Sequence, residues 1–225
     1  MPELLDNIFW NALTGPHAKF AVGAGNARRY APGFSPILGF ADIGHPDFES
    51  LTPYCTAGER FYCGGWAGAT PSGWRLEAES TMCCMHWVGA TPAAEDFPEA
   101  VRLGKEHAAQ ALELAVLTNP GPFGLRTIEL GEYFGCFEDG RLIAMTGERM
   151  HAGALREVSG VCTHPDFQGR GIARRLMIKV INRQLQRQEI PFLHVMSANA
   201  IARRLYEKLG FRNYHETVVR VISPC

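Results

Sequence analysis

The sequence has 225 residues, of which 46% are hydrophobic and 20% charged, and its formal net charge at pH 7 is -1. This balance gives no electrostatic reason to expect binding to nucleic acid or to a membrane surface. No apolar run approaches the ~20 residues that span a bilayer, and the N-terminus MPELLDNIFW lacks the basic and apolar regions of a signal peptide. The length suits one large domain or two small ones.

The seven cysteines and eight histidines indicate neither a disulfide framework nor a metal site. The cysteines are odd in number, form no C-x-x-C pair and lie mostly in apolar segments. The histidines show no spacing typical of zinc ligands. We therefore expect reduced thiols, a cytoplasmic location and no metal.

Residues 1–81 are irregular and rich in glycine, proline and aromatic residues. They predict only short elements, which are strands at 18–30 and 59–68, a helix at 45–54 and turns at 64–73. No linker separates them from the buried strand predicted at 82–90. We interpret 1–81 as an accessory lobe that covers one side of a site in the main domain, and 82–225 as that main domain. A degenerate half-copy of the main fold is one origin left open for the lobe.

The next segment predicts a helix followed by a strand meander. The helix is expected from about Asp96 to Leu117, with Glu95 or Asp96 starting it, Pro98 in its first turn and Asn119-Pro120-Gly121 stopping it. Strands are expected at 132–138, 141–149 and 156–163. Asp139-Gly140 predicts the first hairpin turn, and the second is expected around Ala152-Gly153.

A helix between two strands predicts a parallel βαβ unit with a right-handed crossover. The helix begins near 172 and carries two apolar rows at i, i+4 spacing, which are Ile172, Leu176 and Val180 beside Ala173, Met177, Ile181 and Leu185. The second strand is expected at 191–197. A short helix follows with Ile201, Leu205 and Leu209 buried and Gly210 at its end, and the last strand is expected at 213–223.

The loop from Gln168 to Ala173 lies between the strand and the helix of this unit. A helix N-terminus offers unpaired N–H groups and a partial positive charge, and small residues let a diphosphate approach the backbone. Arg170, Arg174 and Arg175 add charge nearby. The G-x-G-x-x-G fingerprint fails because residue 174 is arginine, and no Gly-Lys-Ser/Thr follows for a P-loop. A plain glycine turn is the alternative interpretation.

The stretch VCTHPDFQGRGIARRLM resembles the acyl-CoA-binding motif of the GNAT superfamily of N-acyltransferases. In that motif Arg or Gln is followed, after two residues, by Gly-x-Gly/Ala, and Gln168, Gly171 and Ala173 match it. The family's second signature is matched by NAIARRLYEKLGF, from Asn199 to Phe211. The resemblance implies an α+β fold whose mixed, mostly antiparallel sheet splays apart between 156–163 and 191–197.

By this resemblance, the two motifs hold acetyl-CoA as co-substrate, with a longer acyl chain left open. The backbone of Val161 and Thr163 would pair with the pantetheine arm, the Val161 N–H would polarise the thioester carbonyl, and Asn199 would bind the arm. Tyr206 matches the family's usual general acid for the departing thiolate. The full set of expected CoA contacts is Val161, Cys162, Thr163, Gln168, Gly169, Arg170, Gly171, Ile172, Ala173, Arg174, Asn199 and Tyr206.

Glu148 and Glu157 are the candidate general bases. A hairpin symmetric about Ala152-Gly153 would place them directly opposite each other, with Cβ atoms about 5 Å apart. Two carboxylates so close disfavour joint ionisation, which raises one pKa toward neutrality. A register change of one residue is the alternative, and it would pair Glu148 with Arg156 or Arg149 with Glu157 in a surface salt bridge.

Two other mechanisms stay open. Cys162 and His164 would share a strand face and could form a nucleophilic pair, and a non-catalytic acyl-CoA-binding module would keep the loop without the acid and base. For the enzyme, we expect a primary amine of a small molecule or an amino acid as acceptor. Neither nucleic acid nor a membrane is expected as a partner, and a homodimer is left open.

Overall fold

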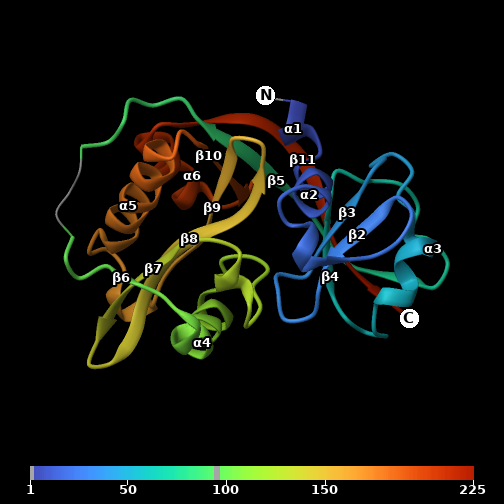
Figure 1. The fold of residues 1–225 in the computed structure, drawn as a ribbon, viewed down its shortest axis with the longest axis horizontal. Helices are drawn as coiled ribbons and strands as arrows, with labels where there is room; N and C mark the ends of the chain where they lie inside the picture. Colours follow the sequence, from blue (N-terminus) through green and yellow to red (C-terminus); the bar gives the residue numbers. More distant parts are fainter. Residues whose placement is uncertain (1–2, 94–96) are drawn as a thin grey trace.

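The computed structural model describes residues 3–93 and 97–225, and within them one mixed sheet of eleven strands runs through the molecule (Figure 1). The strands are β1 Ala21–Val22, β2 Ala27–Tyr30, β3 Ile37–Phe40, β4 Phe61–Gly64, β5 Trp74–Trp87, β6 Val101–Arg102, β7 Tyr133–Glu138, β8 Arg141–Ala152, β9 Leu155–Thr163, β10 Ile190–Met196 and β11 Phe211–Pro224. Their order across the sheet is β1-β2-β3-β4-β11-β5-β10-β9-β8-β7-β6.

The α-helices are α1 Glu3–Asp6, α2 Ile8–Thr14, α3 Phe48–Leu51, α4 Ala108–Thr118, α5 Ile172–Gln186 and α6 Ala200–Leu209. Within the described residues, short 3₁₀ helices connect other elements, at Ala18–Phe20, Thr52–Tyr54, Lys105–His107, Thr127–Glu129 and Pro165–Phe167. The combination confirms the predicted α+β class.

The N-terminal segment continues the sheet of the rest of the chain. β5 and β11 pair with each other along their length, and β4 adds to the free edge of β11. The boundary expected between residues 81 and 82 falls inside β5. Leu13 of α2 lies in one apolar cluster with Met150 of β8 and Phe192 of β10, so the N-terminal helices share a core with the meander.

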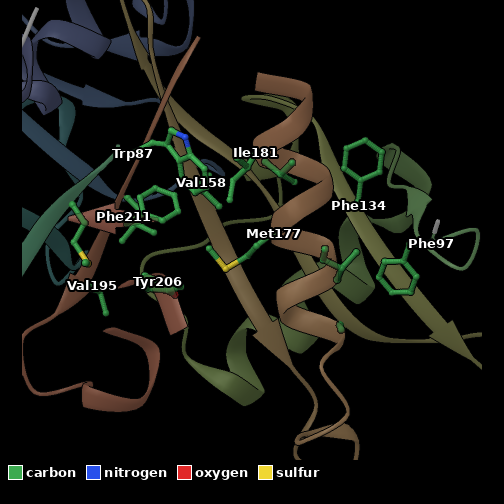
Figure 2. Packing of buried hydrophobic residues seen from close by; sticks show 14 of the residues in the cluster. Trp87, Phe97, Phe134, Val158, Met177, Ile181, Val195, Tyr206 and Phe211 are labelled. Carbon is green, nitrogen blue, oxygen red and sulfur yellow. The ribbon is translucent and has the colours of Figure 1, made fainter. Parts of the chain in front are cut away.

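The two faces of β8 and β9 are covered by different helices. On one face, Met177 and Ile181 of α5 pack with Val158 and Phe134 (Figure 2). On the other face, α4 packs against the sheet through a cluster that contains Leu114, Tyr133 and Cys162.

Most predicted elements are confirmed. The meander strands form as expected, the turn is at Asp139-Gly140 with both residues at positive φ, and β10 is parallel to β9 across α5. The apolar rows of α5 face the core, with Leu176, Met177, Val180 and Ile181 buried. The predicted burial of Ile201 is wrong, because its side chain is 85% exposed. Helix α6 packs on the core through Tyr206 and its apolar neighbours instead.

The predicted helix at 96–117 is wrong in its first third. Glu95 and Asp96, expected to start it, lie outside the described residues. Pro98 is in a turn, and Val101–Arg102 pairs with β7 as β6. The helical segment begins after Gly104, whose N–H donates to His107 Nδ1 at 2.9 Å. Sheet pairing therefore overrides the local helical pattern here.

Candidate active site

A wedge opens in the middle of the sheet between β9 and β10. The two strands pair over only three residues each, Leu155–Glu157 against Ile190–Phe192. Beyond these, β9 continues against β8 and β10 against β5. The edges that face each other, 158–163 and 193–196, therefore have no ladder partner within the described chain, and their backbone groups can pair with a ligand.

A β-bulge lies on the β9 side of the wedge. Met145 pairs with Cys162 and Gly147 pairs with Ser159. The β9 segment between these pairs is therefore one residue longer than the β8 segment opposite it. Gly160, inside this interval, has φ 62°. The bulge reverses the strand alternation, so that Val158 and Val161 both face α5 whereas Cys162 faces α4.

The predicted glycine loop lies at the N-terminus of α5, where the chain leaves the wedge along β9. Gly169 and Gly171 have φ 78° and 74°, and a Cβ at either would meet no described atom within 4 Å. Gly171 is the N-cap of α5 and offers no side-chain cap, so its side chain does not occupy the first N–H groups of the helix. Arg170 stacks on the Phe167 ring 4.8 Å away, beside the same loop.

Asn199 and Tyr206 lie on the opposite side of the wedge. Asn199 is the N-cap of α6, and its Oδ1 accepts a hydrogen bond from the Ala202 N–H at 3.1 Å. Tyr206 is 7% exposed and lies beside Val195 and Phe211 in Figure 2. Burial raises the pKa of Tyr206 to about 12, with a further contribution from the Cys162 thiol, so the phenol keeps its proton at pH 7.

The predicted pairing of Glu148 with Glu157 is wrong. The hairpin turns at Gly153-Ala154, one residue later than expected, so Ala152 pairs with Leu155, and Glu148 pairs with Val158. An extra residue on β8 between Glu148 and His151 shifts the register again. Glu148 and Glu157 therefore lie on opposite faces of the sheet, and the predicted pair of adjacent carboxylates does not form.

Glu157 is instead held in a buried ion cluster at the closed end of the wedge. Its carboxylate accepts hydrogen bonds from Arg149 Nε and Nη2 at 2.8 and 2.7 Å, and lies 2.8 Å from His194 Nδ1. All three side chains are at most 8% exposed. Burial opposes ionisation of Glu157, but the charges and hydrogen bonds of Arg149 and His194 outweigh it and lower its pKa to about 2. A carboxylate held in this way is a weak base.

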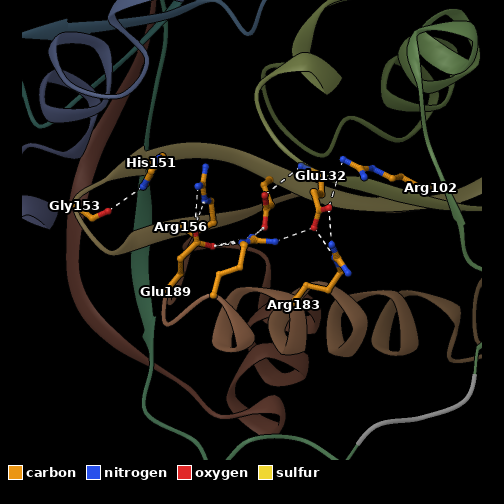
Figure 3. A network of polar contacts seen from close by, with 9 residues as sticks. Arg102, Glu132, His151, Gly153, Arg156, Arg183 and Glu189 are labelled. Atoms are coloured by element: carbon orange, nitrogen blue, oxygen red, sulfur yellow. Dashed lines mark hydrogen bonds and ion pairs between the residues drawn. The ribbon is translucent and has the colours of Figure 1, made fainter.

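Glu148 faces the C-terminal end of α5 and belongs to a separate network. Its carboxylate accepts hydrogen bonds from Arg187 Nη2 and from the Glu132 N–H. Figure 3 shows the surrounding ion pairs, with Glu132 between Arg102 and Arg183 and with Glu189 beside Arg156. Glu148 is 2% exposed. Both predicted bases therefore form ion pairs with arginine side chains.

The structure gives no support to a Cys162–His164 nucleophilic pair. Burial raises the pKa of the Cys162 thiol to about 12, which disfavours the thiolate that attacks. The His164 ring lies 3.0 Å from Arg141 Nη2 and accepts a hydrogen bond from the Asp166 N–H. All seven cysteines are free thiols, as expected.

A cleft of about 380 Å³ lies on the α4 side of the sheet. Its walls come from α4, from the loop after it, from the β5–β11 ribbon and from the N-terminal segment. Arg60, Tyr62, Glu77 and Asn119 are its main polar residues, and Phe123 is its largest apolar one. Phe123 also packs edge-on against Tyr133, with ring centroids 5.9 Å apart.

Some of these features escaped the sequence analysis. The Arg149–Glu157 pair, which the sequence left open as an alternative, does form, but it is buried rather than at the surface. His194 carries no local signal, because its role depends on strands that meet only in the folded sheet. Tyr133 could have been found, since isolated glycines inside strands, here Gly147 and Gly160, often mark close approach of another group. Among residues 3–93 and 97–225, no group of three or more His, Cys, Asp or Glu side chains is arranged to hold a metal, and no helix is long and apolar enough to span a membrane.

Comparisons with known proteins find a related family model and related solved structures. A family model described as FR47-like protein matches residues 133–221. A solved structure from Novosphingobium aromaticivorans, described as an acetyltransferase of the GNAT family, is 36% identical, covers 100% of this chain and 99% of its own, and has a TM-score of 0.89. No match was found among curated proteins.

Two more distant structures show the fold alone. A GCN5-related N-acetyltransferase-like protein from Streptococcus suis is 16% identical over 97% of this chain and 92% of its own, with a TM-score of 0.63. A GCN5-related N-acetyltransferase from Kribbella flavida is 14% identical over 95% and 93%, with a TM-score of 0.55. The fold, the splayed wedge and the full-length similarity define an acyltransferase. The chain belongs to the GNAT family of acetyltransferases.

Proposed function

We propose that the protein transfers an acetyl group from acetyl-CoA to a primary amine of a small molecule or an amino acid. The observation that carries the proposal is the wedge between β9 and β10, with an open glycine loop at the N-terminus of α5 and a buried phenol at Tyr206. The donor supplies an activated thioester when bound.

Each side of the wedge has a separate task in this proposal. The first N–H groups of α5 and the loop Gln168–Ala173 bind the diphosphate. The backbone of Val161 and Thr163 binds the pantetheine arm, with Asn199 on the other side. The Val161 N–H stabilises negative charge on the carbonyl oxygen. The protonated phenol of Tyr206 donates its proton to the leaving sulfur.

Deprotonation of the acceptor is assigned to water rather than to a carboxylate. Glu157 is neutralised by Arg149 and His194, and Glu148 is neutralised by Arg187. We therefore expect kcat/KM to rise with pH toward the pKa of the amine itself. Glu148→Gln and Glu157→Gln should leave the acidic limb of that profile in place, and loss of the limb in a folded variant would restore that glutamate as the base.

The donor half of the proposal is tested by calorimetry on Gly171→Asp. The substitution adds a carboxylate where a phosphate must bind, so acetyl-CoA affinity should be lost. Gly73→Asp is the matched control, because Gly73 has φ 79° and equally open surroundings but lies far along the chain from the loop. Unchanged affinity in a folded Gly171→Asp variant would remove the loop from the donor site.

The acceptor half is tested by a screen of amino acids and aliphatic amines, read by release of the CoA thiol. At least one amine should accelerate release above the rate of thioester hydrolysis. Binding of acetyl-CoA without transfer to any amine of the screen would contradict the proposed acceptor class.

A further inference from the structure

Two glycines make room for the side chain of Tyr133. Tyr133 on β7 pairs with Gly147 on β8, where an added Cβ would lie 2.2 Å from the Tyr133 ring. A Cβ at Gly160 on β9 would lie 3.0 Å from the ring and 3.6 Å from the hydroxyl oxygen. The ring therefore crosses β8 and brings its hydroxyl to the bulge in the strand that borders the wedge.

The Tyr133 hydroxyl has no hydrogen-bond partner among the residues that the structure describes. The residue is 0% exposed, and a buried hydroxyl without a partner destabilises a fold, because water is lost and nothing replaces it. Tyr30 makes the contrast clear. It is also buried, but its hydroxyl lies 2.7 Å from His17 Nδ1. Phenylalanine would fill the same space at position 133 without the unpaired group.

The position of this hydroxyl points to the acceptor rather than to the donor. The α5 face of β9 is filled by Val158 and Val161, whereas Tyr133 lies on the α4 face with Phe123 packed against it. Phe123 also lines the cleft on that face. Phe123 therefore lies between the cleft and Tyr133, and an amine in the cleft would have to displace its ring to reach the hydroxyl beside the bulge.

We propose that the Tyr133 hydroxyl accepts a hydrogen bond from the acceptor amine and orients its nitrogen toward the wedge. This inference rests on the proposed function, since it assigns a residue to the acceptor side of that reaction. Burial raises the pKa of Tyr133, so the group stays a neutral phenol. Its oxygen keeps a lone pair for the incoming N–H.

Tyr133→Phe in the full chain tests the inference, with Tyr30→Phe as control. The probe is the amine from the screen that the wild type acetylates fastest. In Tyr133→Phe, the acceptor KM should rise roughly tenfold, the loss of one hydrogen bond, while acetyl-CoA affinity by calorimetry is unchanged. Its midpoint of unfolding in guanidinium should equal or exceed that of the wild type, whereas Tyr30→Phe should unfold earlier.

An unchanged acceptor KM in Tyr133→Phe would overturn the inference. So would an earlier unfolding midpoint similar to that of Tyr30→Phe, because the hydroxyl would then have a structural partner. This stability comparison needs no acceptor. A wild type that binds acetyl-CoA but acetylates no amine would count against the proposed function, and the stability comparison would still decide whether the hydroxyl is structural.

Discussion

Replacement of Glu157 by glutamine should strongly destabilise the fold, because the carboxylate neutralises two buried cations. Glu157→Gln keeps the volume but leaves Arg149 without a counter-ion. A pKa lowered from 4.5 to about 2 corresponds to about 3 kcal/mol, at ~1.4 kcal/mol for each pH unit. Removal of one partner from a buried ion pair costs about 3–5 kcal/mol. Both approaches predict a loss of about 3 kcal/mol in the free energy of unfolding at pH 7.

The pH dependence of this loss has a definite sign. The folded-state pKa of Glu157 is lowered, so its contribution is present above pH 4.5 and disappears as the pH falls through about 2. The difference between wild type and Glu157→Gln should therefore narrow over that range. Burial opposes protonation of His194, but Cys84 and Glu157 raise its pKa to about 9. Its contribution is therefore present below pH 6.5 and lost as the pH rises through about 9.

The assay is equilibrium unfolding in guanidinium, followed by tryptophan fluorescence between pH 3 and 9. Glu129→Gln is the matched control, since it removes the same group from the exposed Arg126–Glu129 pair, whose hydrogen bonds are 3.0 and 3.1 Å long. Exposed pairs contribute little, so this variant should behave like the wild type. A loss of less than ~1 kcal/mol in Glu157→Gln, or a loss that does not vary with pH, would refute the reasoning.

Three further predictions concern the reaction and the N-terminal segment. Tyr206→Phe should lower kcat by roughly 10²-fold with acetyl-CoA affinity unchanged, and wild-type turnover under conditions where chemistry limits the rate would exclude the role of acid. Cys162→Ala should keep most of the turnover, because the buried thiol is not ionised at pH 7, and a loss as large as that in Tyr206→Phe would favour covalent catalysis. Deletion of residues 1–81 removes β4 and the first half of β5, both partners of β11, so the product should aggregate, and a soluble, fully active 82–225 fragment would show that the segment is dispensable.

The sequence by itself determined the features that depend on neighbours in the chain. The glycine loop before α5, the apolar rows of that helix, the Asp139-Gly140 turn and the βαβ unit each rest on residues within a few positions of one another. Positive φ at Gly171 and the i, i+4 spacing of Leu176 and Val180 are local requirements. Such requirements hold whatever the rest of the chain does, and the motif that resembles the GNAT family lies within them.

Only the tertiary structure decided which side chains meet at the site. The hairpin turns one residue later than the sequence predicts, and β8 contains an extra residue. As a result, the partners of Glu157 are Arg149 and His194, and Glu148 is not one of them. The physical reason is that strand register has a period of two, so a shift of one residue exchanges the two faces of the sheet. Burial of the apolar face selects the register, and the charges buried with it must then find partners on other strands, as Glu157 does with His194, which is far away in the sequence.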